Sequence, residues 1–351
     1  MKEDVYFYVN GPARLLQASV IAEELYPAHR KHLILLHQFG YSYDALLPHV
    51  QHLFSRTFDV RIGLDKYSAI DQVLRTYVYR DRALMDFFQP GSHVILFGIR
   101  SPTQKLIIRH NKRIGNTVDI YAESLSVNRY FVEPPPAPWW RTLIRHALSR
   151  AFLYQHDYDT FFVIEPSLYD GSPNRHKLRA MFDLYGSPSF ERYAGLLTQG
   201  VDTGGLDDYE MVFVGQPLSN GEKYLEPAEE EHLLGEIVGD RRALIFPHPR
   251  EKLSPGQDKY RALRHSRVLR SGVPSELLLL RLRPAVTATY YSTAALNYAM
   301  MNRRSMNFFY PIHRSVFQML TEFRRALPNI VVSDAYLIGE DPYASPRRLA
   351  P

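Results

Sequence analysis

Short apolar runs alternate with amphipathic segments along the chain. In the first half, runs of four or five apolar residues predict strands, and segments with apolar residues at helical spacing predict helices. The expected strands cover residues 5–9, 33–36, 58–62, 94–97, 118–121 and 161–164, and the expected helices cover 13–25, 45–54, 70–88 and 104–112. Strands separated by helices at this spacing favour a mostly parallel sheet with helices on both faces. The first half therefore predicts one α/β domain.

The second half repeats this alternation. The expected strands cover residues 211–214, 243–246, 267–269, 286–291, 307–310 and 330–332, and the expected helices cover 226–238, 276–282, 293–301 and 316–327. A less regular, glycine-containing stretch from about 174 to 208 is interpreted as the connection between domains. We therefore expect two Rossmann-like domains, 1–173 and 174–351, that face each other across a cleft.

Composition and charge narrow the class of protein. The chain has 351 residues, 45% hydrophobic and 23% charged, which is ordinary for a soluble globular protein. Its net charge is +5, from 42 Lys and Arg against 37 Asp and Glu, which suits an acidic substrate and is too small to require nucleic acid. The absence of cysteine excludes disulfides, thiolate metal sites and a cysteine nucleophile.

The location of the protein is also predicted from sequence patterns. The N-terminus enters a strand-like run without a signal-peptide pattern, and no window approaches 18 uninterrupted apolar residues. These patterns predict a cytoplasmic protein. A proline-rich spacer at 133–138 precedes a basic helix at 139–154, in which Trp140 and Ile144 share a face. This helix either docks on the cytoplasmic face of the inner membrane or is a core helix with solvated arginines, and we favour the core helix.

A histidine follows one of the apolar strands of the second half. Pro247 ends the strand at 243–246, so His248 falls just past its carboxyl end, where open α/β sheets place their ligands. Pro249 fixes the backbone on the other side, and Arg250 follows closely. A rigid histidine beside a guanidinium suits an anionic leaving group. The alternative interpretation is a histidine in an ordinary turn.

Two further strand ends carry polar residues. Ser292 and Thr293 stand where a strand becomes a helix, so hydroxyls and helix N–H groups would converge on a phosphate, unless the pair is only an N-cap. Glu165 and Asp170 lie on a turn-rich loop after the strand at 161–164. A carboxylate in such a loop can act as a general base, although Asp-Gly is also a common turn sequence.

The order of these motifs resembles that of bacterial sialyltransferases. An Asp-Gly loop, a Gly-Gln-Pro turn at 215–217, the His-Pro strand end and the Ser-Thr pair follow one another along residues 5 to about 332. The sequence is similar in this respect to glycosyltransferase family 52, the lipooligosaccharide sialyltransferases, and to the bacterial polysialyltransferases. The resemblance implies a GT-B fold, inversion at the anomeric carbon, no metal and no cofactor. It also implies CMP-sialic acid as donor and a cell-surface glycan or glycolipid of lipooligosaccharide or capsule type as acceptor.

The same resemblance implies roles for individual residues. His248 would contact the CMP phosphate and Asp170 would be the general base. The expected substrate-binding residues are Gly171, Gln216, Pro249, Arg250, Glu276, Ser292 and Thr293. Tyr169 stands where the family pattern has a second acid, so Glu165 is the alternative base. Glu276 either accepts hydrogen bonds from the cytidine ribose or is a surface glutamate favoured by the helix dipole.

Two other functions agree with parts of the pattern. Nothing in these motifs selects the sugar, so the donor could instead be another CMP-activated acid such as Kdo. The basic balance and the many aromatic residues also fit a non-catalytic nucleotide- or nucleic-acid-binding protein. That alternative predicts no CMP affinity and a binding constant that falls steeply with salt.

Overall fold

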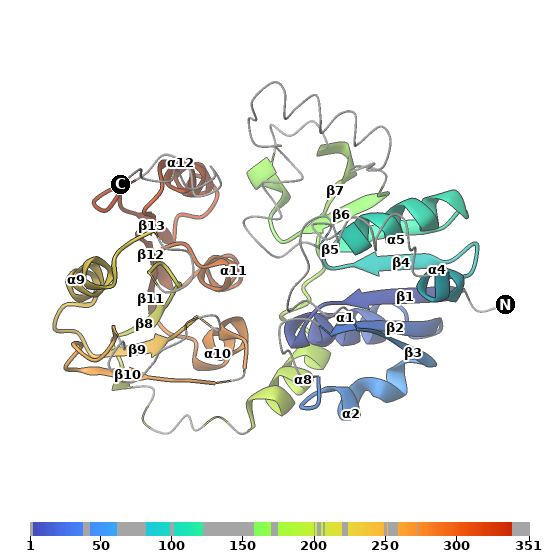
Figure 1. Cartoon of the computed structure of the whole chain (residues 1–351), viewed down its shortest axis with the longest axis horizontal. Helices are drawn as coiled ribbons and strands as arrows, with labels where there is room; N and C mark the ends of the chain where they lie inside the picture. The colour runs from blue at the N-terminus through green and yellow to red at the C-terminus, as the bar shows by residue number, and fades with distance from the viewer. Residues whose placement is uncertain are drawn as a thin grey trace. The chain divides into compact units, whose positions relative to one another are not determined.

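The chain forms two compact units, Met1–Gln199 and Gly200–Pro351, which are shown in Figure 1. The computed structural model describes residues 3–37, 43–61, 82–98, 102–121, 158–169, 175–199, 201, 205, 208–219, 224–248, 251, 259–271 and 273–338. Each unit contains a parallel sheet with its own hydrophobic core.

The first unit contains a seven-stranded sheet. Its strands are β1 (Asp4–Val9), β2 (Arg30–His37), β3 (Arg56–Arg61), β4 (His93–Leu96), β5 (Thr117–Tyr121), β6 (Thr160–Val163) and β7 (Leu178–Ala180). They run parallel in the order β3-β2-β1-β4-β5-β6-β7. Every residue of β1 is buried, as expected for a central strand covered on both faces.

The part of the first unit that the structure describes contains both α-helices and short 3-10 helices. They are α1 (Pro12–Glu24), α2 (Leu47–Val50), η1 (Gln51–Leu53), α4 (Arg82–Phe87), α5 (Pro102–Arg113), η2 (Pro166–Tyr169), η3 (Arg175–Lys177) and α8 (Pro188–Thr198). Helix α8 begins at the N-cap Ser187, whose hydroxyl accepts from the Phe190 N–H. It packs on α1, where the Tyr193 hydroxyl donates to Glu23 at 2.5 Å and the Ser189 hydroxyl donates to Glu24 at 2.5 Å.

The boundary between the units therefore lies later than we expected from the sequence. The stretch 174–208, interpreted as a connection, contains β7 and α8, and both belong to the first unit. Strand β7 pairs with β6 and α8 packs on α1, so the chain leaves this unit only after Gln199 instead of after residue 173. Only Leu178 of the three β7 residues is buried, which explains why no apolar run marked this strand.

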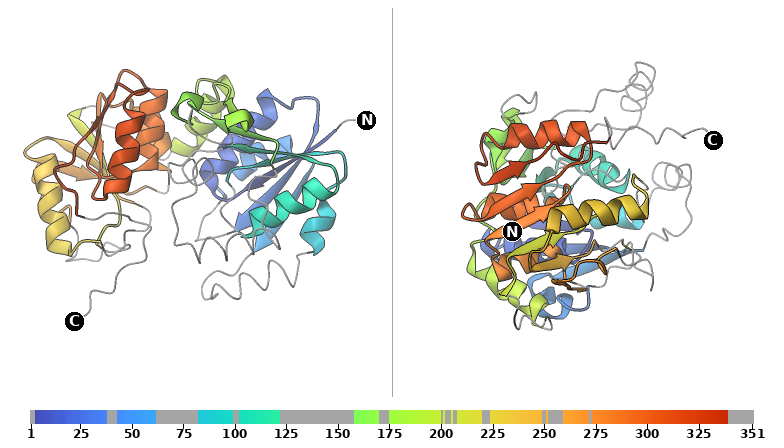
Figure 2. Two further views of the ribbon diagram at one scale, coloured as in Figure 1. Left: turned by 90° about the horizontal axis from the view of Figure 1, so that it is seen from above. Right: turned by 90° about the vertical axis from the view of Figure 1, so that its left-hand side faces the viewer.

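The second unit contains a six-stranded sheet. Its strands are β8 (Met211–Val214), β9 (Ala243–Phe246), β10 (Ser266–Val268), β11 (Val286–Thr289), β12 (Met306–Phe309) and β13 (Ile330–Val332). Its helices are α9 (Pro227–Val238), α10 (Ser275–Leu282), α11 (Thr293–Met301) and α12 (Arg314–Phe323). Helix α9 covers one face of the sheet and α10 and α11 cover the other, as Figures 1 and 2 show. Apolar side chains of α9 pack on Phe213 and Ile245 of the central strands.

The two sheets share a strand order. All strands of the second sheet run parallel in the order β10-β9-β8-β11-β12-β13, which is 3-2-1-4-5-6 within the unit. The first six strands of the first sheet follow the same order. This is the Rossmann strand order, in which ligands bind beside the first strand, at the point where the order of the strands reverses. The prediction of two Rossmann-like α/β domains is confirmed, and a cleft between them stays a prediction.

Most expected elements are found with shifts of a few residues at their ends. Helix α10, expected at 276–282, begins one residue earlier at Ser275, with Pro274 in the cap position. The expected helix at 70–88 is described only as α4, and the proline-rich spacer and the basic helix at 139–154 lie outside the described residues. Among the helices that the structure describes, none has both the length and the apolar character needed to cross a membrane.

Candidate functional site

The carboxyl ends of β8, β9 and β11 form the edge at which we place the candidate site. In a Rossmann order, the switch point lies between the first and fourth strands, here β8 and β11. The Gly215 N–H donates to the Phe246 carbonyl at 2.8 Å, which extends the pairing of β8 and β9 by one step. The loops after these strands therefore leave the sheet side by side.

His248 lies two residues beyond β9 and is half-buried. Its N–H donates to the Glu251 carboxylate oxygen Oε1 at 3.2 Å, and its carbonyl accepts from the Glu251 N–H at 2.8 Å. The backbone of the His248 turn is thus fixed by two hydrogen bonds to one residue. Because the backbone N–H is committed to Glu251, contact with an anion at this point would come from the imidazole. The neighbouring predicted residues Pro249 and Arg250 lie outside the described residues.

The Ser-Thr pair lies at the switch point, after β11. Ser292 is 3% exposed, and its hydroxyl accepts from the Ala294 N–H at 3.2 Å, which confirms its role as the N-cap of α11. Its own N–H donates to the Thr289 hydroxyl, and that hydroxyl donates to the Val214 carbonyl of β8 at 2.8 Å. Thr293 is the first residue of α11 and is half-buried. Of the pair, Thr293 is the more accessible to a ligand.

Gln216 and Glu276 lie at the same edge. Gln216 follows β8, is 8% exposed, and its carbonyl accepts from the Lys259 ammonium at 2.9 Å. Glu276 is half-buried in the first turn of α10, which follows β10 and therefore begins at the carboxyl end of the sheet. The structure thus brings four predicted segments to one edge, namely Gln216, His248, Glu276 and Ser292–Thr293.

A buried cluster of charged residues under this edge was missed by the sequence analysis. Glu230, Glu251 and Lys259 have side chains at most 5% exposed, and Lys259 bridges the two carboxylates. Burial raises the pKa of Glu251, opposed by the Lys259 charge and by hydrogen bonds from the Tyr260 hydroxyl and the His248 N–H. In the sequence these residues stand in polar stretches, and no local pattern indicates that they are buried.

The predicted base lies in the first unit, after β6. Asp170 and Gly171 lie outside the described residues, so the assignment of the base stays a prediction. Glu165 is half-buried just past β6, and its carboxylate accepts from the Ser167 hydroxyl at 2.7 Å. Tyr169, which replaces the second acid of the family pattern, is 6% exposed and belongs to the core.

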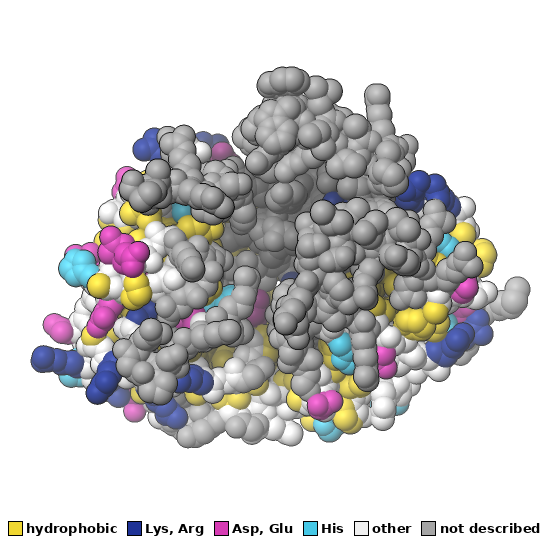
Figure 3. All heavy atoms as spheres, viewed as in Figure 1, with side chains coloured by type: hydrophobic (Ala, Val, Ile, Leu, Met, Phe, Trp, Pro, Cys, Tyr) yellow, Lys and Arg dark blue, Asp and Glu magenta, His cyan; other side chains and the backbone are white. Residues whose placement is uncertain are grey.

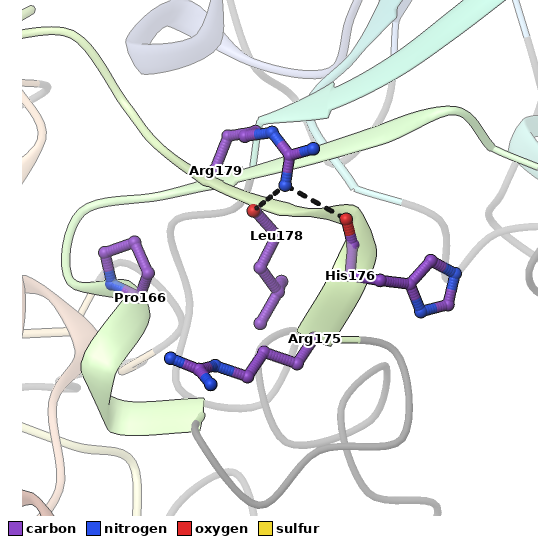
Figure 4. A pocket seen from close by; sticks show the side chains of 5 residues that line it. All are labelled: Pro166, Arg175, His176, Leu178 and Arg179. Atoms are coloured by element: carbon purple, nitrogen blue, oxygen red, sulfur yellow. Dashed lines mark hydrogen bonds between the residues drawn. The ribbon is translucent and has the colours of Figure 1, made fainter.

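A cavity of about 490 Å³ lies beside this segment. It is lined by Pro166, Arg175, His176, Leu178 and Arg179. Figure 4 shows Arg175 extending toward the side on which Pro166 lies, while His176 points away. The Arg179 guanidinium folds back on the chain and donates to the carbonyls of His176 and Leu178 at 3.0 and 2.7 Å. The lining residues are mostly cationic or polar, which suits an acidic or hydroxyl-rich ligand better than an apolar one.

Carboxylates elsewhere in the first unit have structural roles. The sequence contains one Asp-x-Asp at 157–159, a spacing that metal-dependent sites can use. Asp157 lies outside the described residues, and Asp159 pairs with Lys112 at 2.7 Å and accepts from the Val118 N–H at 2.8 Å. Within the described residues, no group of three or more His, Asp or Glu side chains is arranged to hold a metal ion.

Two acid–histidine clusters lie at the opposite, amino-terminal end of the first sheet. Asp4 at the start of β1 pairs with Arg30 and lies 3.0 Å from the His32 ring nitrogen Nε2. The Arg30 hydrogen bond lowers the pKa of Asp4, and burial lowers the pKa of His32. Asp119 pairs with His93 at 2.7 Å in the same region. These clusters are remote from the carboxyl end and do not enter the candidate site.

The two Rossmann-like domains together define a GT-B fold. No protein-family model matches the sequence, and no curated protein matches it. Solved structures do match in fold: Arabidopsis thaliana UGT89C1 complexed with UDP has a TM-score of 0.59 at 13% identity, over 97% of this chain and 86% of that one. A UGT transferase from Siraitia grosvenorii in complex with UDP has a TM-score of 0.57 at 12% identity, over 96% and 89%.

An epimerase structure matches equally well. UDP-GlcNAc 2-epimerase from Methanocaldococcus jannaschii has a TM-score of 0.56 at 12% identity, over 97% of this chain and 89% of that one. At these identities the similarity shows the fold alone. The chain therefore has a GT-B fold, which it shares with these proteins over 96–97% of its length.

Proposed function

We propose that this protein is a glycosyltransferase that takes its sugar from a nucleotide donor. The observation that carries the proposal is the meeting of Gln216, His248 and Ser292–Thr293 at the ends of three adjacent parallel strands, at the switch point of the second sheet. That edge is where open α/β sheets bind nucleotides. The UDP complexes of two proteins with this fold support a nucleotide ligand.

The donor that we propose is CMP-sialic acid. The motif order supports it, and so do the hydrogen-bond donors that the described residues can offer at the edge. A nucleoside monophosphate leaves with less charge than a diphosphate, so one imidazolium with the hydroxyl and N–H groups at the start of α11 could stabilise it without a metal. A UDP-sugar is the competing donor, because both UGT structures hold UDP. A CMP-activated acid such as Kdo would use the same phosphate contacts.

The reaction that we propose is a single inverting displacement. A hydroxyl of a cell-surface glycan or glycolipid attacks the anomeric carbon while the bond from that carbon to the CMP phosphate oxygen breaks. The base takes the hydroxyl proton, and CMP leaves with the bonding electron pair. Asp170 is our candidate for the base and Glu165 the alternative. His248 would bind the phosphate oxygen on which negative charge grows.

Calorimetric titration tests the donor directly. The protein is titrated with CMP and with UDP, each in EDTA and again in magnesium. We expect CMP to bind in EDTA with unchanged affinity in magnesium, and more tightly than UDP. Tighter binding of UDP would move the donor to the UDP-sugars. Absence of binding by both nucleotides would overturn the proposed function.

The His248→Ala variant tests the role of the imidazole. We expect a fall in turnover of roughly 100-fold or more, comparable to the loss of one preorganised donor, and a smaller loss of CMP affinity. The measurement is steady-state kinetics with CMP-sialic acid, with CMP binding followed in parallel. Parental turnover in this variant would show that His248 is only a turn residue.

A further inference from the structure

Lys259 is the centre of the buried charged cluster beneath the candidate site. Its ammonium contacts Glu230 Oε1, and lies 2.9 Å from the Gln216 carbonyl and 3.3 Å from Glu251 Oε1. An ammonium has three N–H donors, and here three acceptors surround it. Its surroundings are thus specific for a lysine, since an apolar side chain would leave all three acceptors without this donor.

The two carboxylates connect different parts of the second unit to this lysine. Glu230 of α9 accepts from the Ser219 N–H at 2.9 Å and from the Ser219 hydroxyl at 2.5 Å, in the loop after β8. Glu251 accepts from the His248 N–H at 3.2 Å and from the Tyr260 hydroxyl at 2.7 Å, in the segments after β9. One ammonium therefore cross-links the loops that follow two adjacent strands.

A buried cluster of charged residues such as this one contributes little net stability to the fold. Two carboxylates and one ammonium must lose their hydration, and well-packed apolar residues of similar volume often stabilise a core as well or better. What the charged cluster supplies is a fixed hydrogen-bond geometry. It lies directly under Gln216 and His248, at the edge of the sheet where the ligand is expected.

We propose that Glu251 is a positioning residue, which holds His248 in the orientation needed to contact the donor phosphate, with Lys259 and Glu230 holding Glu251 in place. The inference rests on the proposed function of this edge. In this role Glu251 acts on the ligand through His248, by way of the His248 N–H, which is its direct contact with the candidate site. Its contribution to turnover therefore disappears when the imidazole is removed.

Glu251→Ala is the variant that tests this role. It leaves Lys259 paired with Glu230, a balanced pair, whereas removal of Lys259 would leave two buried carboxylates without a cation. We expect turnover with CMP-sialic acid to fall about 10- to 100-fold, the effect of a misplacement of about 1 Å at a catalytic group. The CMP affinity should stay within about threefold, because most ground-state contacts remain.

A double-mutant cycle separates positioning from a general structural effect. Parent, His248→Ala, Glu251→Ala and the double variant are compared at one temperature well below all four melting temperatures. We expect the double variant to turn over as slowly as His248→Ala alone. Glu251→Gln keeps a carbonyl oxygen for the His248 N–H and should recover most of the turnover. As a control, Asp119→Asn removes a buried carboxylate of the first unit and should leave turnover unchanged.

The outcomes distinguish this inference from the proposed function. If Glu251→Ala keeps parental turnover while His248→Ala does not, the positioning role is overturned and the proposed function stands. Multiplicative losses in the double variant, or no recovery in Glu251→Gln, also overturn the positioning role. If CMP fails to bind the parent or His248→Ala is fully active, the proposed function itself fails.

Discussion

Replacement of Gly215 by alanine should destabilise the second unit strongly. A Cβ at this position would lie 2.4 Å from the Tyr260 hydroxyl oxygen, 3.0 Å from Glu251 Oε1 and 3.3 Å from the Phe246 carbonyl oxygen. Ordinary contact begins at 3.4 Å, so the hydroxyl must move by about 1 Å. Tyr260 is 2% exposed and cannot move outward without disturbing the core.

The size of the effect follows from the hydrogen bond that this movement breaks. The Tyr260 hydroxyl donates to Glu251 at 2.7 Å, and a shift of about 1 Å takes it beyond hydrogen-bond range. Leaving a buried acceptor unsatisfied costs about 1–3 kcal/mol, and overpacking a full core costs about 1–3 kcal/mol more. We therefore expect Gly215→Ala to lower the free energy of unfolding by about 2–6 kcal/mol.

Urea unfolding followed by circular dichroism measures this loss. The matched control is Gly235→Ala in α9, where an added Cβ meets nothing within 4 Å. That change should stabilise the protein by about 0.5–1 kcal/mol, because alanine favours a helix interior over glycine. If Gly215→Ala unfolds at the parental urea midpoint, the close packing of the charged cluster against the β8 loop is not as we describe it.

Two further predictions concern carboxylates. Asp170→Asn should abolish transfer to the acceptor and leave the CMP affinity nearly intact, because an amide cannot take a proton, whereas Glu165→Gln should change the activity little. The reverse result would make Glu165 the base. Full activity in both variants would show that neither carboxylate is the base. Asp4 has a pKa lowered by the Arg30 hydrogen bond, so its stabilising effect is present above about pH 4 and is lost as the pH falls further. The Asp4→Asn variant should therefore have a lower free energy of unfolding than the parent at neutral pH. In urea titrations this free energy should fall less steeply than that of the parent below about pH 4, and parallel pH curves for the two proteins would contradict this.

Charge on the described surface bears on the nucleic-acid alternative. On the face drawn in Figure 3, the described Lys and Arg side chains lie in several separate groups, some of them near Asp and Glu side chains. A broad basic stripe is the usual electrostatic footprint of a nucleic-acid-binding protein. The described part of this face does not carry one.

The central strands were predictable because burial on both faces demands continuous apolar runs. Tyr6-Phe7-Tyr8 and Leu244-Ile245-Phe246 are such runs, and each lies in a fully buried strand. Once those strands were located, the proline after Phe246 fixed where the chain turns, so His248 was correctly expected at a strand end. The ends of strands and the residues just beyond them are thus accessible to reasoning from sequence alone.

The charged cluster was not predictable for an equally physical reason. Lys259 meets Glu230 across 29 residues and Gln216 across 43, so no local spacing records the contact. A buried charge is recognised only by the partners that compensate it. The edge strand β7 was not predicted for a different reason. Only one of its three residues is buried, so its sequence shows no alternation of apolar and polar positions. Helix α8 did carry a signal, the Ser187-Pro188 start, which is typical of a helix N-terminus.

The strand order of the second unit has a consequence for folding during synthesis on the ribosome. Thr289 of β11 bonds to Val214 of β8 across 75 residues, so β8 is synthesised long before its second neighbour. Until then, β8 has a partner only in β9, and the other edge of a wholly apolar strand is open. Open apolar edges are templates for pairing with other chains, and such long-range contacts form slowly. The segment that completes the ligand edge, β11 with Ser292, is thus also the one that covers the open edge of β8 in the growing chain.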